Sequence, residues 1–332
     1  MDTKFKTDET ILDPGLKLRA AKWADLTAVA QLMYEVWEDD GDTTMAATPE
    51  DLKIRWQIPG FNLEQDTFVV ETPDGRIVGF DQFENHYLHA ILETEGYVHP
   101  EFKGHGIGTS LLRTVEKRAY EEMRLAEPDV RISLRSPINN RDQAAHELHR
   151  KEGYVPIRYY WRMETNLPAL PVPANFPEGI ELRPFIKDEH AHAVLDAQNE
   201  SFRDHWSNHD ETYEQWAPRK FGRKEFDPSL WMIAWDGDQI AGFSQNRYRG
   251  GIGWIGTLGV RRPWRKHGLG EALLLHSFAE FYERGMKTIG LGVDAQNPTG
   301  ATRLYQKVGM HPASEHVTCE KVLRPGRNVD EE

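Results

Sequence analysis

Two glycine-containing segments combine unhindered backbone amides with cationic side chains. Residues 98–108 read VHPEFKGHGIG, and residues 260–270 read VRRPWRKHGLG. In the second segment Gly268 and Gly270 open an apolar-faced helical pattern, where bare N–H groups and the helix dipole favour an anion. The basic residues around them are Arg261, Arg262, Arg265, Lys266 and His267. These residue types and spacings predict a site that holds a pyrophosphate group.

The glycine spacing differs from that of two common nucleotide-binding motifs. A dinucleotide-binding fold requires G-x-G-x-x-G and an acidic residue that closes a following strand, and neither is evident. No G-x-x-x-x-G-K-[ST] occurs, which excludes a P-loop. A plain strand–helix connection with solvated charges is the alternative, and the occurrence of the arrangement twice weighs against it.

The two segments belong to an internal duplication. LKLRA at 16–20 returns as IELRP at 180–184, and TFVVETPDGRIVGF at 67–80 returns as LWMIAWDGDQIAGF at 230–243. A proline-rich stretch between the copies is typical of a semi-rigid linker. We predict a first domain over 14–165, a linker over 166–177 and a second domain over 178–325.

Each copy predicts the same order of elements. A short strand leads into a helical pattern, and two apolar runs then meet at a hairpin signal, Asp74-Gly75 or Asp236-Gly237. A strand ending at Val98 or Val260, the glycine segment, a long helix, a strand, a second helix and a closing strand follow. The predicted fold class is α/β, with two tandem domains that each form a twisted mixed sheet flanked by helices.

Composition bounds the classes of function. The 332 residues fit two domains at ~150 residues each. The formal charge of −13 disfavours nucleic acid and anionic membranes as partners, and no apolar run is long enough to span a bilayer. One cysteine, Cys319, excludes an internal disulfide framework and a thiolate zinc cluster. The start MDTKFKTDET lacks the apolar core of a secretory signal, so we expect a cytoplasmic protein.

The motif V-x-P-x-x-[KR]-x-x-G-x-G resembles the acetyl-CoA motif of the GNAT acetyltransferase superfamily. Residues 98–108 match it fully, and the second copy places Pro263 one position later than the pattern. Downstream, VDAQNPTGATRLYQKVGM resembles the following strand and helix of that superfamily. The resemblance covers nearly the whole chain as two such domains, and the two-domain organisation is most similar to mycothiol synthase and its relatives.

The resemblance implies acetyl-CoA as co-substrate, bound at the strand end and glycine segment of each copy. In the second copy these residues are Leu258, Gly259, Val260, Arg265, Lys266, His267, Gly268, Leu269, Gly270 and Asn297, and in the first copy Tyr97, Val98, Lys103, Gly104, Gly106 and Gly108. Backbone amides at 258–260 would align the pantetheine arm, and the 265–270 turn would hold the pyrophosphate.

By the same resemblance, Tyr305 is the catalytic acid that protonates the departing CoA thiolate. Read without it, Asn297 suits an N-cap and Pro298 the first helical position, and Tyr305 could be an ordinary buried tyrosine. The first copy has His149 where the second has Tyr305. His149 is either an acid or the mark of a copy that binds cofactor without turnover.

The base and the acceptor remain open in the sequence. Asp204, His205, Asp294 or ordered water could each accept the proton of the attacking amine. The acceptor pocket is expected near 36–42 and 201–216, where acidic and aromatic residues suit a small cationic amine. A solvated acidic face explains the same residues. Small amines, aminoglycosides, polyamines, an amino-sugar thiol precursor and protein N-termini all stay possible.

The leading interpretation is therefore an acetyl-CoA-dependent N-acetyltransferase whose second domain acts by direct amine attack in a ternary complex. The rivals are a non-catalytic acyl-CoA-binding or sensing protein and a scaffold for protein interaction. No metal is expected, because paired histidines such as His205 and His209 lack a third ligand. The oligomeric state is open, and the two domains could act as an internal pseudo-dimer.

Overall fold

The computed structural model describes residues 12–224 and 226–329 and divides the chain into two compact units. The segment MDTKFKTDET lies outside the described residues. Unit 1 comprises residues 1–157 and 317–332, and unit 2 comprises residues 158–316. Within the described part of the chain, no helix is long and apolar enough to cross a membrane.

The two units exchange part of their closing strands. Most of β6 (Val155–Asn166) belongs to unit 2, where it pairs antiparallel with β11 (Thr288–Asp294), and most of β12 (His311–Arg324) belongs to unit 1 beside β5 (Ile132–Asn139). The predicted boundaries, 14–165 and 178–325, assigned each closing strand to its own copy. They remain our proposal for the duplicated stretches of sequence, while the compact units cut across them.

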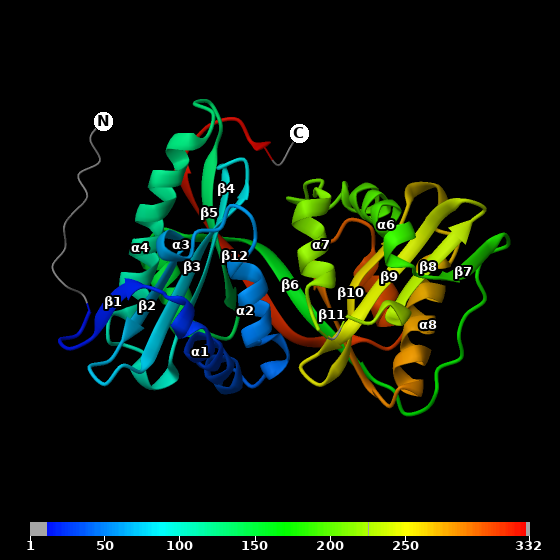
Figure 1. The fold of residues 1–332 in the computed structure, drawn as a ribbon, viewed down its shortest axis with the longest axis horizontal. Helices are drawn as coiled ribbons and strands as arrows, with labels where there is room; N and C mark the ends of the chain where they lie inside the picture. Colours follow the sequence, from blue (N-terminus) through cyan, green and yellow to red (C-terminus); the bar gives the residue numbers. More distant parts are fainter. Residues whose placement is uncertain (1–11, 225, 330–332) are drawn as a thin grey trace. The chain divides into compact units, whose positions relative to one another are not determined.

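Unit 1 is a mixed sheet with the strand order β1-β2-β3-β4-β5-β12 (Figure 1). Its other strands are β1 (Lys17–Ala20), β2 (Thr67–Glu71), β3 (Ile77–Tyr87) and β4 (Ile91–Val98). Its helices are α1 (Leu26–Asp39), α2 (Pro49–Trp56), α3 (Leu63–Asp66), α4 (Ile107–Glu122) and α5 (Gln143–Lys151). The strands β4 and β5 run parallel, whereas β1 with β2, β2 with β3 and β3 with β4 each pair antiparallel.

Unit 2 repeats this order as β7-β8-β9-β10-β11, with β6 beside β11. The strands are β7 (Ile180–Pro184), β8 (Trp231–Asp236), β9 (Gln239–Arg249) and β10 (Ile252–Val260). The helices are α6 (Lys187–Phe202), α7 (Tyr213–Phe221), α8 (Leu269–Glu283) and α9 (Ala301–Lys307). Residues 167–177, within the predicted linker, form neither helix nor strand. The mixed α/β fold and its duplication are thus confirmed.

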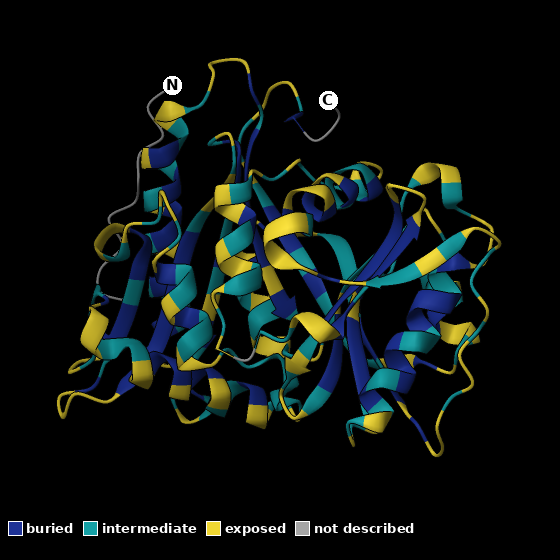
Figure 2. Ribbon diagram, turned by 45° about the vertical axis from the view of Figure 1, so that its right-hand side comes forward, coloured by how far each residue is buried: buried dark blue, intermediate teal, exposed yellow. Residues whose placement is uncertain are grey.

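Alternation along each strand directs side chains to helices on both faces of the sheet. In β2, Val69 packs with α1 and α2, whereas the adjacent Val70 packs with Ile107 and Leu111 of α4. Figure 2 shows the buried strands beneath partly exposed helices. Small residues let these helices approach closely: a Cβ on Gly79 of β3 would lie 2.5 Å from Ile107 Cγ2. The start of α4 is therefore fixed against the sheet.

The hairpin predictions are confirmed in both units. β2 and β3 flank the Asp74-Gly75 turn, and β8 and β9 flank Asp236-Gly237. Gly75 and Gly237 adopt φ of 88° and 55°, which non-glycine residues rarely adopt. These hairpins align the strands that lead into the glycine segments.

Candidate active site

In each unit the two central parallel strands pair briefly and then separate. β4 pairs with β5 from Ile91 to Glu93, and β10 pairs with β11 from Gly253 to Ile255. Both β4 and β10 continue well beyond these pairs, to Val98 and Val260. A wedge therefore opens between the strands, bordered in unit 2 by the 257–260 backbone. Such an edge offers hydrogen-bonding groups to an extended ligand.

Only unit 2 has an irregularity at the point where this wedge opens. The pairing of β10 with β9 shifts register between Ile255 and Thr257, which leaves Gly256 as an extra residue. A Cβ on Gly256 would lie 2.9 Å from the carbonyl oxygen of Gln245, so glycine suits this position. In unit 1 the corresponding stretch of β4, Thr94–Val98, pairs regularly with β3. Bulges redirect strands and side chains next to active sites.

The glycine segments start α4 and α8 with bare amides in both units. Gly106 (φ 77°) is the N-cap of α4 and Gly268 (φ 84°) is the N-cap of α8, and neither helix has a side-chain cap. The N–H groups of the first turn are thus available to an anion. Gly104 (φ 92°) precedes the first, and Lys266 (φ 66°) occupies the equivalent position in unit 2. A lysine in this strained region fits a functional loop.

The arginines near Gly268 are held by the protein. Arg265 donates from Nε to the Val260 carbonyl (3.1 Å), from Nη2 to the Ser201 carbonyl (2.9 Å) and from Nη1 to Asp204 (2.9 Å). Arg262 reaches the other carboxylate oxygen of Asp204 at 2.6 Å. Arg265 thereby ties the glycine segment to the end of α6, while Lys266 and His267 are exposed.

Two of the four candidate bases are held in ion pairs. The hydrogen bonds from Arg262 and Arg265 lower the pKa of Asp204 below its usual value. Asp294 accepts from Arg158 Nε (3.1 Å) and Nη2 (2.6 Å). Burial lowers the pKa of His205, which keeps its ring neutral at pH 7. The ion pairs argue against both aspartates as proton acceptors.

Tyr305 lies on α9 with its ring in the core of unit 2. It belongs to the same buried core cluster as Ile255 and Phe278, and the residue is only 8% exposed. Burial raises its pKa to about 12, so the phenol keeps its proton at neutral pH. The hydroxyl has no hydrogen-bond partner among the described residues, yet its oxygen is not among the fully buried side-chain oxygens that lack a partner. It is therefore open to a ligand.

The predicted start of the Tyr305 helix is wrong. α9 begins at Ala301, with Gly300 (φ 81°) as its N-cap, so Asn297 is not the N-cap and Pro298 is not the first helical residue. The side chain of Asn297 instead accepts from the backbone N–H of Thr299 at 2.8 Å. An Asx turn of this kind competes with helix initiation. Tyr305 consequently lies about one helical turn from the start of α9.

A cavity of about 500 Å³ in unit 1 collects the residues predicted there. Its lining includes all six of Tyr97, Val98, Lys103, Gly104, Gly106 and Gly108. Lys103 lies between Asp39 (3.4 Å) and Asp142 (3.6 Å). His149 on α5 and Ser136 on β5 also line the cavity.

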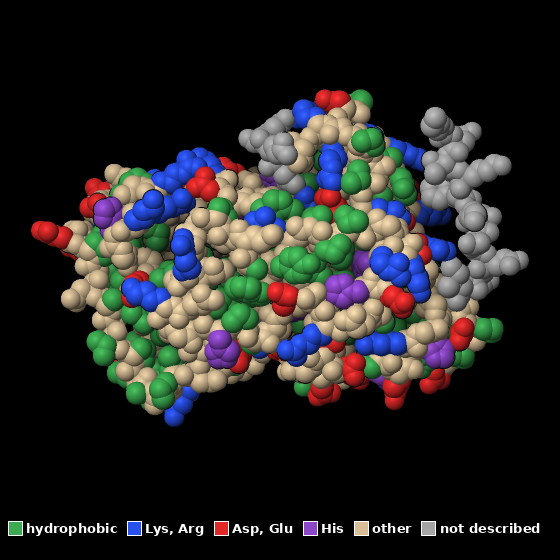
Figure 3. Space-filling view, turned by 180° about the vertical axis from the view of Figure 1, so that it is seen from behind, with side chains coloured by type: hydrophobic (Ala, Val, Ile, Leu, Met, Phe, Trp, Pro, Cys, Tyr) green, Lys and Arg blue, Asp and Glu red, His purple; other side chains and the backbone are tan. Residues whose placement is uncertain are grey.

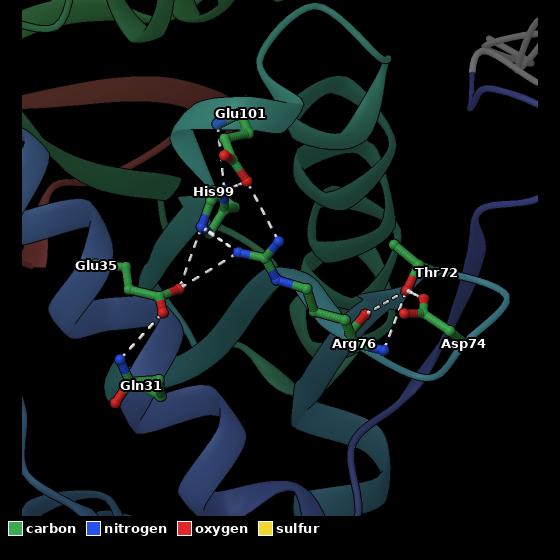
Figure 4. A network of polar contacts seen from close by, with 7 residues as sticks. All are labelled: Gln31, Glu35, Thr72, Asp74, Arg76, His99 and Glu101. Carbon is green, nitrogen blue, oxygen red and sulfur yellow. Dashed lines mark hydrogen bonds and ion pairs between the residues drawn. The ribbon is translucent and has the colours of Figure 1, made fainter.

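A polar network fixes the start of the unit 1 glycine segment (Figure 4). His99, directly after β4, accepts the N–H of Glu101 at Nδ1 (3.2 Å), and its Nε2 lies 3.2 Å from a carboxylate oxygen of Glu35 on α1. Arg76 reaches Glu101 at 3.3 Å. The network links α1 and the turn between β2 and β3 to the glycine segment, so the segment is held from two sides.

Sequence reasoning missed two residues that lie at or beside these wedges. Lys220 on α7 donates to Thr257 Oγ1 at 3.0 Å, and burial together with three nearby arginines lowers its pKa to about 7. In unit 1, Asp81 on β3 accepts from Thr94 Oγ1 at 2.6 Å, and burial raises its pKa to about 7. Neither has a local sequence signal, because each partner lies on another element.

Other sequence expectations concern metals and charge. The described residues contain no group of three or more metal-ligating side chains. Cys319 is buried, and burial raises its pKa to about 11. On the face drawn in Figure 3, Lys and Arg side chains are interspersed with Asp and Glu.

Two sequence profiles match the chain, one in each copy. The Acetyltransferase (GNAT) family matches residues 191–310, and the Acetyltransferase (GNAT) domain matches residues 64–156. The mycothiol acetyltransferase of Streptomyces scabiei is 29% identical over 91% of this chain and 95% of its own length. That of Thermobispora bispora is 33% identical over 64% of this chain and 70% of its own.

Solved structures resemble nearly the whole chain. A GCN5-related N-acetyltransferase from Sphaerobacter thermophilus is 34% identical with a TM-score of 0.79, over 96% of this chain and 99% of that one. A tandem GNAT protein from the clavulanic acid biosynthesis pathway is 17% identical with a TM-score of 0.67, over 94% of this chain and all of that one. The second likeness concerns the fold alone.

Proposed function

This chain belongs to the GNAT acetyltransferase family and is an N-acetyltransferase, and from that premise we propose where and how it acts. The GNAT fold uses acetyl-CoA. Unit 2 transfers the acetyl group to a primary amine by direct attack in a ternary complex. The observation that carries this assignment is the conjunction in unit 2 of a bulged, open strand edge, an uncapped helix start and an unpartnered phenol.

In unit 2, backbone amides bind the parts of the cofactor, and side chains position these amides or add charge. Along the free edge of β10, the backbone groups of Leu258 and Val260 align the pantetheine arm, and Gly259 between them faces β9. The first-turn amides of α8, from Gly268 through Leu269 and Gly270, receive the pyrophosphate, because no side chain caps them. Arg265 positions this turn, Lys266 adds exposed positive charge with the exposed His267 beside it, and Asn297 shapes the loop before α9.

Tyr305 supplies the proton for the leaving group. Its buried phenol is fully protonated at neutral pH, because its pKa is about 12. The proton moves to the CoA sulfur as the C–S bond breaks and negative charge develops there. A positioned acid of this kind contributes ~10²–10⁴ in rate.

Lys220 is the proton acceptor that we propose for the attacking amine. Its ε-amino group donates to Thr257 Oγ1 on β10, one residue before the proposed pantetheine edge. Arg219, Arg223 and Arg247 surround it with positive charge, which favours the neutral amine. The acceptor ammonium gives one proton to Lys220, directly or through the Thr257 hydroxyl. The free amine then attacks the thioester carbon, and the second proton that its nitrogen releases as the amide forms replaces the one that Tyr305 gives to sulfur.

The acceptor is a primary amine. The sequence suggests a cationic amine, but the ion pairs of the acidic residues in the structure modify that preference. Acidic side chains of the 201–216 segment are paired with arginines: Asp204 with Arg262 and Arg265, and Asp210 with Arg203. The cations around Lys220 favour an amine whose remaining groups are neutral or anionic. A panel of spermidine, kanamycin, glucosamine, a cysteinyl amino sugar and a peptide N-terminus separates these classes.

Unit 1 is proposed to hold a second acetyl-CoA. Its cavity is lined by the six predicted residues, yet it lacks a phenol at the position of Tyr305 and a bulge in β4. This favours cofactor binding without amine transfer there. Calorimetric titration with acetyl-CoA should therefore give two sites per chain, with amine acetylation lost only when unit 2 is altered. Binding without acetylation of any amine in the panel would favour a sensing role, and absence of binding would refute the proposal.

A further inference from the structure

A serine and a histidine form a hydrogen-bonded pair in the wall of the unit 1 cavity. Ser136 Oγ lies 2.8 Å from His149 Nε2, and the two residues are 3% and 6% exposed. Both line the cavity of about 500 Å³. The hydroxyl is therefore screened from bulk water by the protein but borders the space where a ligand would bind.

The hydrogen bond made by the other ring nitrogen determines which group of this pair donates and which accepts. His149 Nδ1 lies 2.8 Å from the carbonyl oxygen of Ala145. A carbonyl oxygen can only accept, so Nδ1 carries the proton and the neutral ring presents the lone pair of Nε2 to the Ser136 hydroxyl. A base held by a backbone acceptor and bonded to a hydroxyl is the arrangement that activates a serine nucleophile.

The same arrangement excludes His149 as an acid for CoA in the unliganded protein. Its one proton is bonded to Ala145, and burial lowers its pKa, so the ring is neutral at pH 7. The sequence alone leaves the acid role open. The geometry favours the opposite role, in which His149 first accepts a proton from Ser136.

The place of Ser136 in the sheet brings it to the wedge. Arg135 is the last residue of β5 that pairs with β4, and Ser136 follows it directly. Its counterpart in unit 2, at the same offset that relates His149 to Tyr305, is Gly292. The second copy therefore folds with neither the hydroxyl nor the imidazole, and the pair is not required by the fold.

We propose that Ser136 is an acyl-accepting nucleophile, activated by His149, which makes unit 1 a second reaction centre that takes the acyl group of an acyl-CoA. This rests on the proposed binding of acyl-CoA in the unit 1 cavity. Ser136 Oγ bonds to the thioester carbon and its proton passes to His149 Nε2. The C–S bond then breaks, and the thiolate takes that proton from His149. Water hydrolyses the resulting ester, which frees the carboxylic acid and restores the serine.

The test uses the full chain with two probes, acetyl-CoA and p-nitrophenyl acetate. After rapid quenching, peptide mass spectrometry should find one added acetyl group on Ser136 with both probes. Ser136→Ala should abolish this label, Ser136→Cys should restore acylation, and His149→Gln should slow it about 100-fold. Ser110→Ala, on α4 outside the cavity lining, is the matched control and should behave as the wild type.

Two outcomes separate this proposal from the one on which it rests. If calorimetry shows acetyl-CoA bound in unit 1 while Ser136 stays unlabelled by either probe, the pair is only structural and the inference is overturned. If p-nitrophenyl acetate labels Ser136 but acetyl-CoA neither binds nor labels unit 1, acyl-CoA is refuted as the donor together with the proposed unit 1 binding. Melting curves of all variants verify that loss of label is not loss of folding.

Discussion

Replacement of Gly268 by valine tests the phosphate cradle with little interference from packing. Gly268 has φ of 84°, and a Cβ built there meets no atom of the protein within 4 Å. The substitution therefore creates no clash inside unit 2. The new methyl groups would instead occupy the space beside the first-turn amides of α8, where the pyrophosphate is proposed to bind.

This geometry predicts two separate effects, one on the stability of unit 2 and one on its affinity for acetyl-CoA. A non-glycine residue in the left-handed region costs about 1–2 kcal/mol, which for a unit of ~150 residues lowers Tm by ~2–8 °C. Obstruction of one charge-assisted hydrogen bond to phosphate costs about 1.5–3 kcal/mol. The Kd of the unit 2 site for acetyl-CoA should thus rise by about 10- to 150-fold.

The assay is calorimetric titration with acetyl-CoA beside thermal melting. Gly285→Val is the matched control, because Gly285 has the same φ of 84°, also meets no atom within 4 Å and lies just beyond the other end of α8. It should lose similar stability and keep both sites. Gly106→Val should remove only the unit 1 site. An unchanged Kd in Gly268→Val, at any Tm, would refute the cradle.

Three further predictions concern buried groups. Tyr305→Phe should lower kcat by ~10²–10⁴ while the Kd for acetyl-CoA stays constant, and an unchanged kcat would refute the acid role. For the wild type, kcat/KM should rise with pH through about 7 as Lys220 loses its proton. Lys220→Met should abolish this rise of kcat/KM with pH, whereas Lys187→Met, a control on α6, should retain it. Asp81 has a raised pKa of about 7, so the folded state holds a proton that the unfolded state releases, and stability should fall between pH ~4 and ~7. In Asp81→Asn, Tm should change less with pH over this range, and a pH dependence of Tm equal to that of the wild type would contradict the raised pKa of Asp81.

Local patterns in the sequence predicted the elements that depend on local conformation. The hairpins at Asp74-Gly75 and Asp236-Gly237 and the helix starts at Gly106 and Gly268 require positive φ, which glycine supplies without partners. The start of α9 is the exception. Asn297 has side-chain oxygens that suit either an N-cap or an Asx turn, and the sequence does not distinguish these outcomes.

Groups brought together by tertiary contacts had no such signal. Lys220 and Thr257 are 37 residues apart, and their hydrogen bond depends on how α7 packs against β10. Ser136 and His149 are only 13 residues apart, yet only His149 stands at the position of a motif residue, Tyr305, and nothing in the sequence pairs it with the serine. The exchange of closing strands was equally hidden, because β6 and β12 carry strand patterns that fit either unit.

The two copies keep the same cradle but differ in every group that could move a proton. Unit 2 has a phenol that holds its proton and a lysine whose positive neighbours favour the neutral amine. Unit 1 has a histidine whose only proton is bonded to a backbone carbonyl, and Glu95, at the position of Thr257, accepts from Arg55 at 2.6 Å. An ammonium in unit 1 would therefore find no free base at this position and no phenol at the position of Tyr305. A serine needs neither, because one imidazole serves both proton transfers in sequence. The same fold can thus direct an acyl thioester to an amine in one unit and to its own hydroxyl in the other.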